Sequence, residues 1–354
     1  MRLILASTAV LALAACGAPD REPSGDPSGR AASAAPPVFT AEQIDRAMPA
    51  PETTAGGSGA GSAPADGADA AAAAARPDPG LVRLQILLDR SRFSPGVIDG
   101  LRGENTRQAV AAFREAEGLE GDAIDDALMQ RLTAADSRAA MTTYVITEQD
   151  LAGPFSPPPS GDLAEQARQG VRYTGPRERL AERFHITEAL LQALNPDVDF
   201  RRAGQRLVVP AVGDPDLPEV ARIVVDKGER SLRAFDASDR LIAFYPATIG
   251  SESNPAPSGT LRVNGVAPEP DYTFDPEELS YGSGTETVVV PAGPNNPVGS
   301  VWIDLSRDGY GIHGSPDPSK IAKTASHGCV RLTNWDAEQL AAAVKPGVEV
   351  RFVS

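Results

Sequence analysis

Near its carboxyl end the chain reads Ser326-His327-Gly328-Cys329-Val330-Arg331-Leu332, and a little earlier it reads Gly311-Ile312-His313-Gly314-Ser315. These two stretches hold two of the three histidines in the chain and one of its two cysteines. Apolar and alternating segments lie on both sides of them, so they belong to a β-rich region. A thiol and two imidazoles gathered in so short a region predict a chemically active site.

The surrounding residues form short apolar or alternating runs that are typical of β-strands. We expect strands at residues 223–225, 231–235, 241–245, 287–290, 301–305 and 348–353. The segment 336–344 spaces Leu340 and Val344 four residues apart, which predicts a helix. Residues 219–354 are therefore predicted to form a mainly-β domain that is large enough for its own core.

A cysteine nucleophile needs a base, because a free thiol is ionised to only a few per cent near neutral pH. His313 and His327 are the candidate bases. Gly328 directly precedes Cys329 and allows a substrate carbonyl to approach the main-chain N–H groups that stabilise an oxyanion. Together these residues predict nucleophilic catalysis by Cys329.

The same residues allow other interpretations. A cysteine in a β-domain is often a buried apolar residue, but the nearby histidines and flanking glycines favour catalysis. His313, His327 and Cys329 could also hold zinc together with a water molecule. The sequence shows no further close pair of ligands, so we expect no metal and no cofactor. A papain-like protease is disfavoured because its cysteine signature is missing.

The order His-Gly, about a dozen residues, then Ser-His-Gly-Cys-Val-Arg-Leu resembles the signature of the L,D-transpeptidase catalytic domain, the YkuD domain. Pro257-Ser258-Gly259-Thr260 is similar to the Pro-Thr-Gly loop of that family. Pro294-Asn295-Asn296-Pro297-Val298-Gly299 is similar to its Gly-Pro-x-Asn-Pro-Leu-Gly stretch, and Trp302-Ile303 follows as in the family. The resemblance covers residues 219–354 and implies a β-rich catalytic fold.

The resemblance also implies roles for individual residues. Cys329 would be the acylated nucleophile and His313 the general base, its ring held by the main-chain carbonyl of Gly314 or Ser315. The main-chain N–H groups of Gly328 and Cys329 would form the oxyanion hole. The spacing of the residues alone does not decide which histidine is the base.

Further residues would shape the site or contact the substrate. Ser326 and His327 would shape the loop before the cysteine, with the N–H of His327 as a further oxyanion donor. Arg331 would pair with a substrate carboxylate or hold the loop by a hydrogen bond. Trp302 and Tyr310 are candidates for lining the substrate site, with a place in the core as the alternative.

The reaction implied is acyl transfer on peptidoglycan stem peptides. Cys329 would attack the carbonyl that joins the diamino acid at position three of a stem tetrapeptide donor to D-alanine, releasing D-alanine. An amine acceptor on a second stem would then take the acyl group and give a 3–3 cross-link. Alternatives are hydrolysis by the same site, as an L,D-carboxypeptidase or an amidase on cross-links or wall-linked protein, and a non-catalytic peptidoglycan-binding lipoprotein.

Residues 81–135 predict a three-helix module before the catalytic domain. Leu84-Gln85, the turn 94–100, Thr106 and the Ala-Val-x-x-Phe helix at 109–113 follow the order of a known peptidoglycan-binding module, which they resemble. The alternative is a three-helix domain with no affinity for glycan. Residues 171–211 resemble a LysM module in the order of their segments, although its Gly-Asp-Thr-Leu opening is absent.

The first sixteen residues resemble a bacterial lipoprotein signal. Arg2 precedes the apolar run 3–15, and Leu13-Ala14-Ala15-Cys16 matches the box at which such signals are cut and lipidated. The resemblance implies a lipid on Cys16 that anchors the chain in a membrane. Gly17 stands where a retention Asp would be, which favours the outer membrane over the inner one. We therefore expect a lipid-anchored protein on the periplasmic face of the cell envelope.

The segment between the signal and the predicted modules has an unusual composition, and the net charge of the whole chain excludes one class of partner. Ala, Gly, Pro and Ser make up 43 of the 64 residues from 17 to 80, which predicts a disordered tether. A formal charge of −15 argues against a nucleic-acid partner. The chain is thus expected to be multidomain, with a mainly-β L,D-transpeptidase (YkuD) domain preceded by a three-helix peptidoglycan-binding module and a small α+β LysM-like module.

Overall fold

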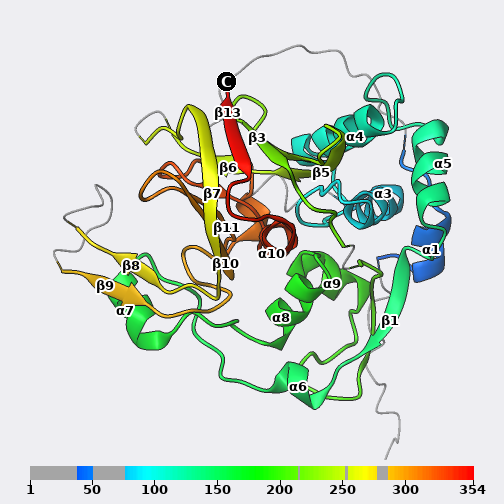
Figure 1. Ribbon diagram of the computed structural model, residues 1–354. Coiled ribbons are helices and arrows are strands. Elements are labelled where there is room, and N and C mark those ends of the chain that lie inside the picture. Colours follow the sequence, from blue (N-terminus) through cyan, green and yellow to red (C-terminus); the bar gives the residue numbers. More distant parts are fainter. Residues whose placement is uncertain (1–37, 51–75, 214–215, 252–253, 277–285) are drawn as a thin grey trace, which may run out of the picture. The chain divides into compact units, whose positions relative to one another are not determined.

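The computed structural model describes residues 38–50, 76–213, 216–251, 254–276 and 286–354, which belong to one compact unit (Figure 1). The predicted signal segment with Cys16 lies outside the described residues, as does most of the predicted tether. Within the described ranges no helix is both long enough and apolar enough to cross a membrane.

The carboxyl-terminal domain contains a nine-stranded sheet in the order β5-β4-β3-β13-β7-β10-β11-β12-β6. The strands are β3 (Arg222–Asp226), β4 (Ser231–Phe235), β5 (Leu241–Pro246), β6 (Thr248–Ile249), β7 (Gly259–Pro268), β10 (Val301–Leu305), β11 (Gly311–His313), β12 (Val330–Arg331) and β13 (Glu349–Val353). A separate antiparallel pair consists of β8 (Tyr272–Phe274) and β9 (Val288–Val290). The prediction of a mainly-β domain is confirmed.

Helix α10 (Asn334–Ala343) begins directly after β12 and contacts β10 and β11. Thr333 caps it by accepting a hydrogen bond from the main-chain N–H of Asp336. Leu340 is fully buried in the core that the helix shares with the sheet. This placement sets the first turn of α10 beside the loops that carry the predicted site. A short 3-10 helix (Pro318–Lys320) lies in the loop between β11 and β12.

The predicted three-helix module consists of α3 (Pro79–Arg90), α4 (Glu104–Ala116) and α5 (Asp126–Ala135). The Gln85 side chain donates to Asp99, Leu101 and Thr106 and accepts from the N–H groups of Asp99 and Gly100. The motif residues Gln85, Asp99, Gly100 and Thr106 therefore meet around one buried amide. Inside this module they serve to fix the turn between α3 and α4.

The helical module shares its core with the catalytic domain. Strand β5 places Phe244, which is fully buried, among the apolar side chains of the three helices. The chain next to α3 also pairs with β5 through main-chain hydrogen bonds from Ser94 to Phe244 and from Phe244 to Arg92. Burial of this aromatic ring across the boundary makes the two parts one packing unit.

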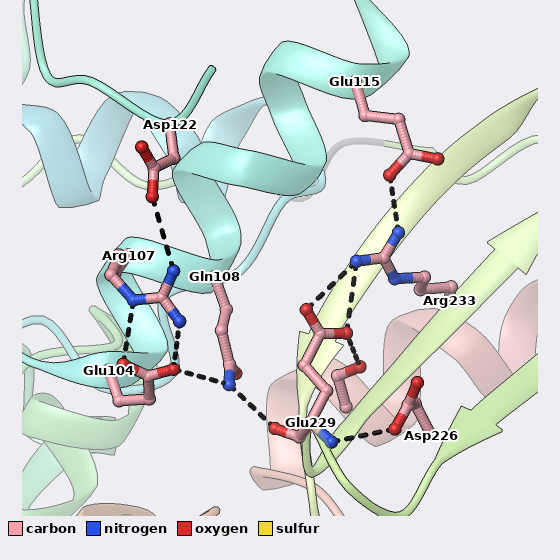
Figure 2. A network of polar contacts seen from close by, with 9 residues as sticks. Glu104, Arg107, Gln108, Glu115, Asp122, Asp226, Glu229 and Arg233 are labelled. Carbon is pink, nitrogen blue, oxygen red and sulfur yellow. Dashed lines mark hydrogen bonds and ion pairs between the residues drawn. The ribbon is translucent and has the colours of Figure 1, made fainter. Parts of the chain in front are cut away.

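A polar network joins α4 to the hairpin β3–β4 on the surface (Figure 2). Gln108 donates to the main-chain carbonyl of Glu229 at 2.8 Å, and Arg233 forms ion pairs with Glu115 at 2.6 Å and Glu229 at 3.1 Å. Arg233 is largely covered, so these pairs are less screened by solvent than ordinary surface pairs. The network fixes the orientation of α4 on the sheet.

The second accessory unit has two strands and four helices. They are β1 (Met141–Val145), α6 (Glu148–Leu151), α7 (Leu163–Gln169), α8 (Pro176–Arg183), α9 (Glu188–Leu194) and β2 (Arg206–Pro210). β1 pairs antiparallel with β2, from Met141 opposite Pro210 to Val145 opposite Arg206. The predicted range 171–211 is therefore too short, because the partner strand of β2 lies thirty residues earlier than its start.

The predicted tether is wrong for residues 38–50, which are folded onto the accessory units. Helix α1 (Ala41–Arg46) begins at Thr40, whose side chain and Gln43 form a capping box. Ile44 is fully buried, and the Asp45 carboxylate accepts hydrogen bonds from the main-chain N–H groups of Ala140 and Met141. Contacts with distant residues stabilise a segment whose composition alone indicates disorder.

Candidate active site

The pairing of β11 with β12 sets the geometry of the site. These strands are parallel, with Ile312 opposite Val330 and His313 opposite Arg331. Ile312 and Val330 are fully buried in the core of the domain. Because successive side chains point to opposite faces of a sheet, His313 and Arg331 lie on the other face. Cys329 lies in the turn just before β12, and the charge of Arg331 acts on both the His313 imidazole and the Cys329 thiol.

Trp302 covers the imidazole of His313 from the neighbouring strand β10. The two residues are opposite each other in the antiparallel β10–β11 pair, and their rings stack with centroids 5.4 Å apart. A side chain at Gly311 would overlap the Trp302 ring, so glycine is required there. Trp302 therefore covers one face of the imidazole of the predicted base His313.

His313 is buried, with 3% of its surface exposed. Its Nδ1 atom lies 2.7 Å from the main-chain carbonyl oxygen of Gly314, so this nitrogen carries the proton and donates it. In this tautomer the lone pair is on the other nitrogen, Nε2, and the main-chain carbonyl of Val298 also lies near the ring. Burial, and secondly the positive charge of Arg331, lower the pKa of His313 to about 3.

Cys329 is half-buried at the start of β12, and its Sγ atom lies 3.5 Å from the carbonyl oxygen of Gly309. Burial raises the pKa of the thiol, while the N–H of Gly311 and the charge of Arg331 act in the opposite direction. The net effect keeps the thiol protonated at neutral pH. The resting site therefore holds a neutral thiol and a neutral imidazole.

The turn before the cysteine is closed by Ser326. Its hydroxyl accepts from the N–H of Gly328 at 3.2 Å and donates to the carbonyl oxygen of Cys329 at 2.6 Å. Gly328 has φ +116°, and a Cβ atom there would lie 2.9 Å from the Tyr310 ring. In this resting state the N–H of Gly328 is bonded to the Ser326 hydroxyl, and its role as an oxyanion donor stays a prediction.

The remaining predicted residues lie around this turn. Tyr310 packs its ring against Gly328, and the Arg307 guanidinium lies 4.7 Å from the ring centre. His327 is exposed, whereas Arg331 is half-buried. Among the described residues, no three His, Cys, Asp or Glu side chains lie close enough together to hold a metal ion.

Sequence reasoning missed Asn334, the first residue of α10. This buried side chain accepts from the N–H groups of Ser300 and Ser315 and donates to Glu182 and to the carbonyl oxygen of Pro294. Its position was a usable signal, since asparagine is a poor helix former unless its amide has partners outside the helix. The partner Glu182 lies on α8, 152 residues away in the chain, and no sequence pattern identifies it.

Comparison with known proteins gives a family match for the carboxyl-terminal part. Residues 220–351 match the model of the L,D-transpeptidase catalytic domain, YkuD. A Bacillus licheniformis protein assigned as the L,D-transpeptidase YkuD is 34% identical over 176 residues, which are 49% of this chain and 90% of that protein. Its counterpart in Bacillus subtilis is 30% identical over 190 residues, or 53% of this chain and 97% of that protein.

Among solved structures, L,D-transpeptidase 3 from Mycobacterium tuberculosis in complex with a faropenem-derived adduct aligns with 43% of this chain and 75% of its own, at 15% identity and a TM-score of 0.33. The matched family model begins at residue 220, so the helical region before it remains unassigned to a family.

Proposed function

Because the chain belongs to the YkuD family of L,D-transpeptidases, we propose that it transfers acyl groups between peptidoglycan stem peptides through a thioester on Cys329. The observation that supports the proposal is the pairing of β11 with β12, which places His313 opposite Arg331 and brings the turn that carries Cys329 to the end of β12. The charge of Arg331 acts on both the imidazole and the thiol, so the two groups belong to one site in this proposal.

The first half-reaction forms the thioester. His313 takes the thiol proton at Nε2 while Sγ attacks the carbonyl that joins the diamino acid at position three of a tetrapeptide to D-alanine at position four. The imidazolium then gives that proton to the amine of D-alanine, which leaves. The Nδ1–H bond to Gly314 holds the ring in the required tautomer throughout.

The second half-reaction regenerates the thiol. An amine on a second stem attacks the thioester, His313 removes a proton from the nitrogen, and the thiolate leaves and is reprotonated. The product is a 3–3 cross-link. The main-chain N–H groups of Gly328 and Cys329 are the oxyanion donors in this proposal, with that of His327 as a further donor. The N–H of Gly328 would exchange its resting bond to the Ser326 hydroxyl for a bond to the oxyanion.

Arg331 has two functions in this scheme. Its charge adds to the effect of burial and keeps the resting His313 imidazole neutral. Its Nε atom is buried without a hydrogen-bond partner among the described residues, which leaves the guanidinium available for a substrate carboxylate. Trp302 and Tyr310 are the aromatic walls on either side.

The accessory units and the anchor complete the proposal. We infer that the helical module and the α/β unit hold peptidoglycan near the site, as peptidoglycan-binding and LysM-like modules. The helical module packs on the catalytic domain through Phe244 and Arg233, and the α/β unit contacts it through the Asn334–Glu182 bond, which supports a fixed distance between bound glycan and Cys329. Cys16 would carry a lipid that anchors the protein on the periplasmic face of the outer membrane. A Cys16→Ala variant should then leave the membrane fraction.

The test uses the full chain in detergent with purified disaccharide-tetrapeptide, followed by mass spectrometry beside the Cys329→Ala variant. Cys329-dependent loss of D-alanine together with cross-linked dimers is the expected result. Loss of D-alanine without dimers, even when an amine acceptor is added, would indicate the hydrolase alternative. If neither monomers nor cross-linked or protein-linked wall change, the binding-lipoprotein alternative replaces the proposal.

A further inference from the structure

The Asn334 side chain has all four of its hydrogen-bonding positions filled. Its Oδ1 accepts from Ser300 N–H at 3.2 Å and Ser315 N–H at 3.0 Å. Its Nδ2 donates to the Glu182 carboxylate at 2.7 Å and to the Pro294 carbonyl at 3.1 Å. An amide with two acceptor sites and two donors can make no more bonds than these. Asn334 therefore ties two loops of the catalytic domain to helix α8 of the accessory unit.

One of these bonds acts on the catalytic base through a single peptide plane. The N–H of Ser315 and the carbonyl of Gly314 belong to the same planar peptide unit and point in opposite directions. On one side the N–H donates to Asn334, and on the other the carbonyl accepts from Nδ1 of His313 at 2.7 Å. Rotation of this plane would break both bonds together, so Asn334 controls the orientation of the imidazole.

Glu182 determines which way the Asn334 amide faces. If the amide were flipped, its NH2 group would meet the N–H groups of Ser300 and Ser315, and its oxygen would meet the carboxylate. All of these contacts would be repulsive. A carboxylate accepts only, and its charge-assisted bond is stronger than a neutral one, so it selects the observed orientation.

The junction around Glu182 is held on both sides. His185, just after α8, stacks on Trp335 of α10 with ring centroids 4.7 Å apart and an interplanar angle of 8°. Its Nδ1 lies 3.1 Å from the Asp89 carboxylate of α3. The end of α8 is thereby fixed against the start of α10, which keeps Glu182 at Asn334.

We propose that Glu182, a residue of the accessory α/β unit, is a positioning residue for the catalytic base His313 and acts through Asn334. Its carboxylate orients the Asn334 amide, the amide orients the peptide between Gly314 and Ser315, and that peptide holds the imidazole toward Cys329. This inference rests on the proposed function insofar as His313 is the base for Cys329. It gives the accessory unit a part in catalysis beyond any binding of glycan.

The ionisation of Glu182 decides the pH at which the test is made. Burial, with repulsion from Glu178 and Glu338, raises the pKa of Glu182 to about 7, against the opposing effects of Asn334 and His185. The titratable groups facing it are Glu178, Glu338, His185 and Tyr173. At pH 8 the carboxylate is mostly ionised and its hold on Asn334 is strongest.

The test compares Glu182→Met, which removes the acceptor at similar length, with Glu182→Gln, which keeps an oxygen that can accept from Asn334. Two quantities are measured at pH 8: kcat and KM for release of D-alanine, and the rate of Cys329 alkylation by iodoacetamide. We expect Glu182→Met to lower kcat and the alkylation rate roughly 10- to 100-fold with little change in KM, since a displaced base loses much of its effect. Glu182→Gln should retain most of both.

Asp150→Asn provides the matched control. Asp150 is a buried carboxylate of the same accessory unit, and its side chain bonds to Tyr144, Thr147 and Arg183 within that unit. This variant should lower the thermal midpoint and leave kcat and alkylation unchanged. If it lowers them as much as Glu182→Met does, the effect is general destabilisation and the proposal is wrong.

A polarity swap tests the relay directly. Asn334→Asp alone places two carboxylates face to face and should be strongly impaired. Adding Glu182→Gln lets the glutamine amide donate to one carboxylate oxygen while the other still accepts from Ser315. The double variant should recover roughly fivefold or more in kcat. A double variant no better than Asn334→Asp alone would overturn the proposal.

Alkylation separates this inference from the proposed function, because it needs no peptidoglycan. If the wild type releases no D-alanine but Glu182→Met still slows alkylation, the positioning role stands and the transferase proposal fails. If His313→Gln is alkylated at the wild-type rate, His313 is not the base and the inference is overturned. Unchanged kcat and alkylation in Glu182→Met would also overturn it.

Discussion

His313 and Arg331 lie directly opposite each other in the parallel pair of β11 and β12, so a guanidinium is held beside the imidazole. Burial is the larger cause of the low pKa of His313, and Arg331 adds to it. The imidazole is therefore neutral and the Cys329 thiol protonated at rest. In the proposed function this favours general-base activation of Cys329 over a preformed thiolate–imidazolium pair.

Removal of the Arg331 charge should raise the pKa of His313. A nearby cation disfavours the imidazolium, so the Arg331→Met variant should bind the proton at higher pH than the wild type. The acid limb of the pH profile for alkylation of Cys329 should move upward, yet stay below the ordinary histidine value because burial remains. Arg331→Lys, which retains a charge, should move it less. An acid limb that does not move would show that Arg331 has no electrostatic effect on the base.

Gly311 should not tolerate a side chain while Trp302 is present. A Cβ atom at Gly311 would overlap the Trp302 ring, so Gly311→Ala must push that ring away from His313. We expect a loss of about 1–3 kcal/mol in the free energy of unfolding and a fall in the rate of D-alanine release. Denaturant unfolding and the release assay measure the two effects.

Removal of the Trp302 ring provides the control for this prediction. In a Trp302→Ala background the same Gly311→Ala change should cost much less stability, because the overlapping atoms are gone. Equal costs in both backgrounds would mean that the clash with Trp302 is not the cause.

The helical module should unfold together with the catalytic domain. Phe244→Ala removes a fully buried ring that belongs to strand β5 but packs among α3, α4 and α5, and should cost about 3–5 kcal/mol. We expect the wild type to show one cooperative transition when circular dichroism and tryptophan fluorescence are followed in denaturant. Two separate transitions in the wild type would contradict the shared core.

The parts of the fold that sequence could predict are those with a strong local pattern. Alternation at 301–305 predicted strand β10, and the spacing of Leu340 and Val344 predicted helix α10 to within two residues of its ends. The site motif was equally local, since thiol, imidazole and glycines occur close together in the chain. The unbroken apolar run at 241–245 indicates a strand that is buried on both faces. Strand β5 is such a strand, because the helical module covers the face that the core of the domain does not.

The parts that sequence could not predict depend on distant contacts. Strand β1 is mostly exposed, with Met141 its one buried residue, so it lacks the alternation that marks a half-buried strand. Helix α1 is held by burial of Ile44 and by the bonds of Asp45 to a segment about a hundred residues away. The link between Glu182 and Asn334 likewise exists only once α8 is packed on α10.

The buried carboxyl of Asp336 should make the folded protein less stable as the pH rises toward neutrality. Asp336 is 3% exposed and accepts a hydrogen bond from Ser94 at 2.9 Å. Burial, with repulsion from Asp89, raises its pKa from 3.8 to about 7, while Thr333, Ser94 and His185 oppose the rise. Between these two values the folded state binds more protons than the unfolded state, so stability is fully present below the lower value and is lost as the pH rises through the upper one.

Asp336→Asn removes this titration and keeps an oxygen that can accept from Ser94. We expect the variant to be the more stable protein at pH 8, by on the order of 3 kcal/mol, and to lose most of that advantage by pH 5 and the rest below the unfolded value of 3.8. Denaturant unfolding at several pH values between 5 and 8 measures the difference. The surface variant Asp122→Asn should follow the wild type at every pH, since Asp122 is exposed. The prediction fails if the free energy of unfolding of Asp336→Asn depends on pH in the same way as that of the wild type. The Asp336 carboxyl would then be ionised in the folded protein throughout this range, and the charge of His185 would offset the repulsion from Asp89.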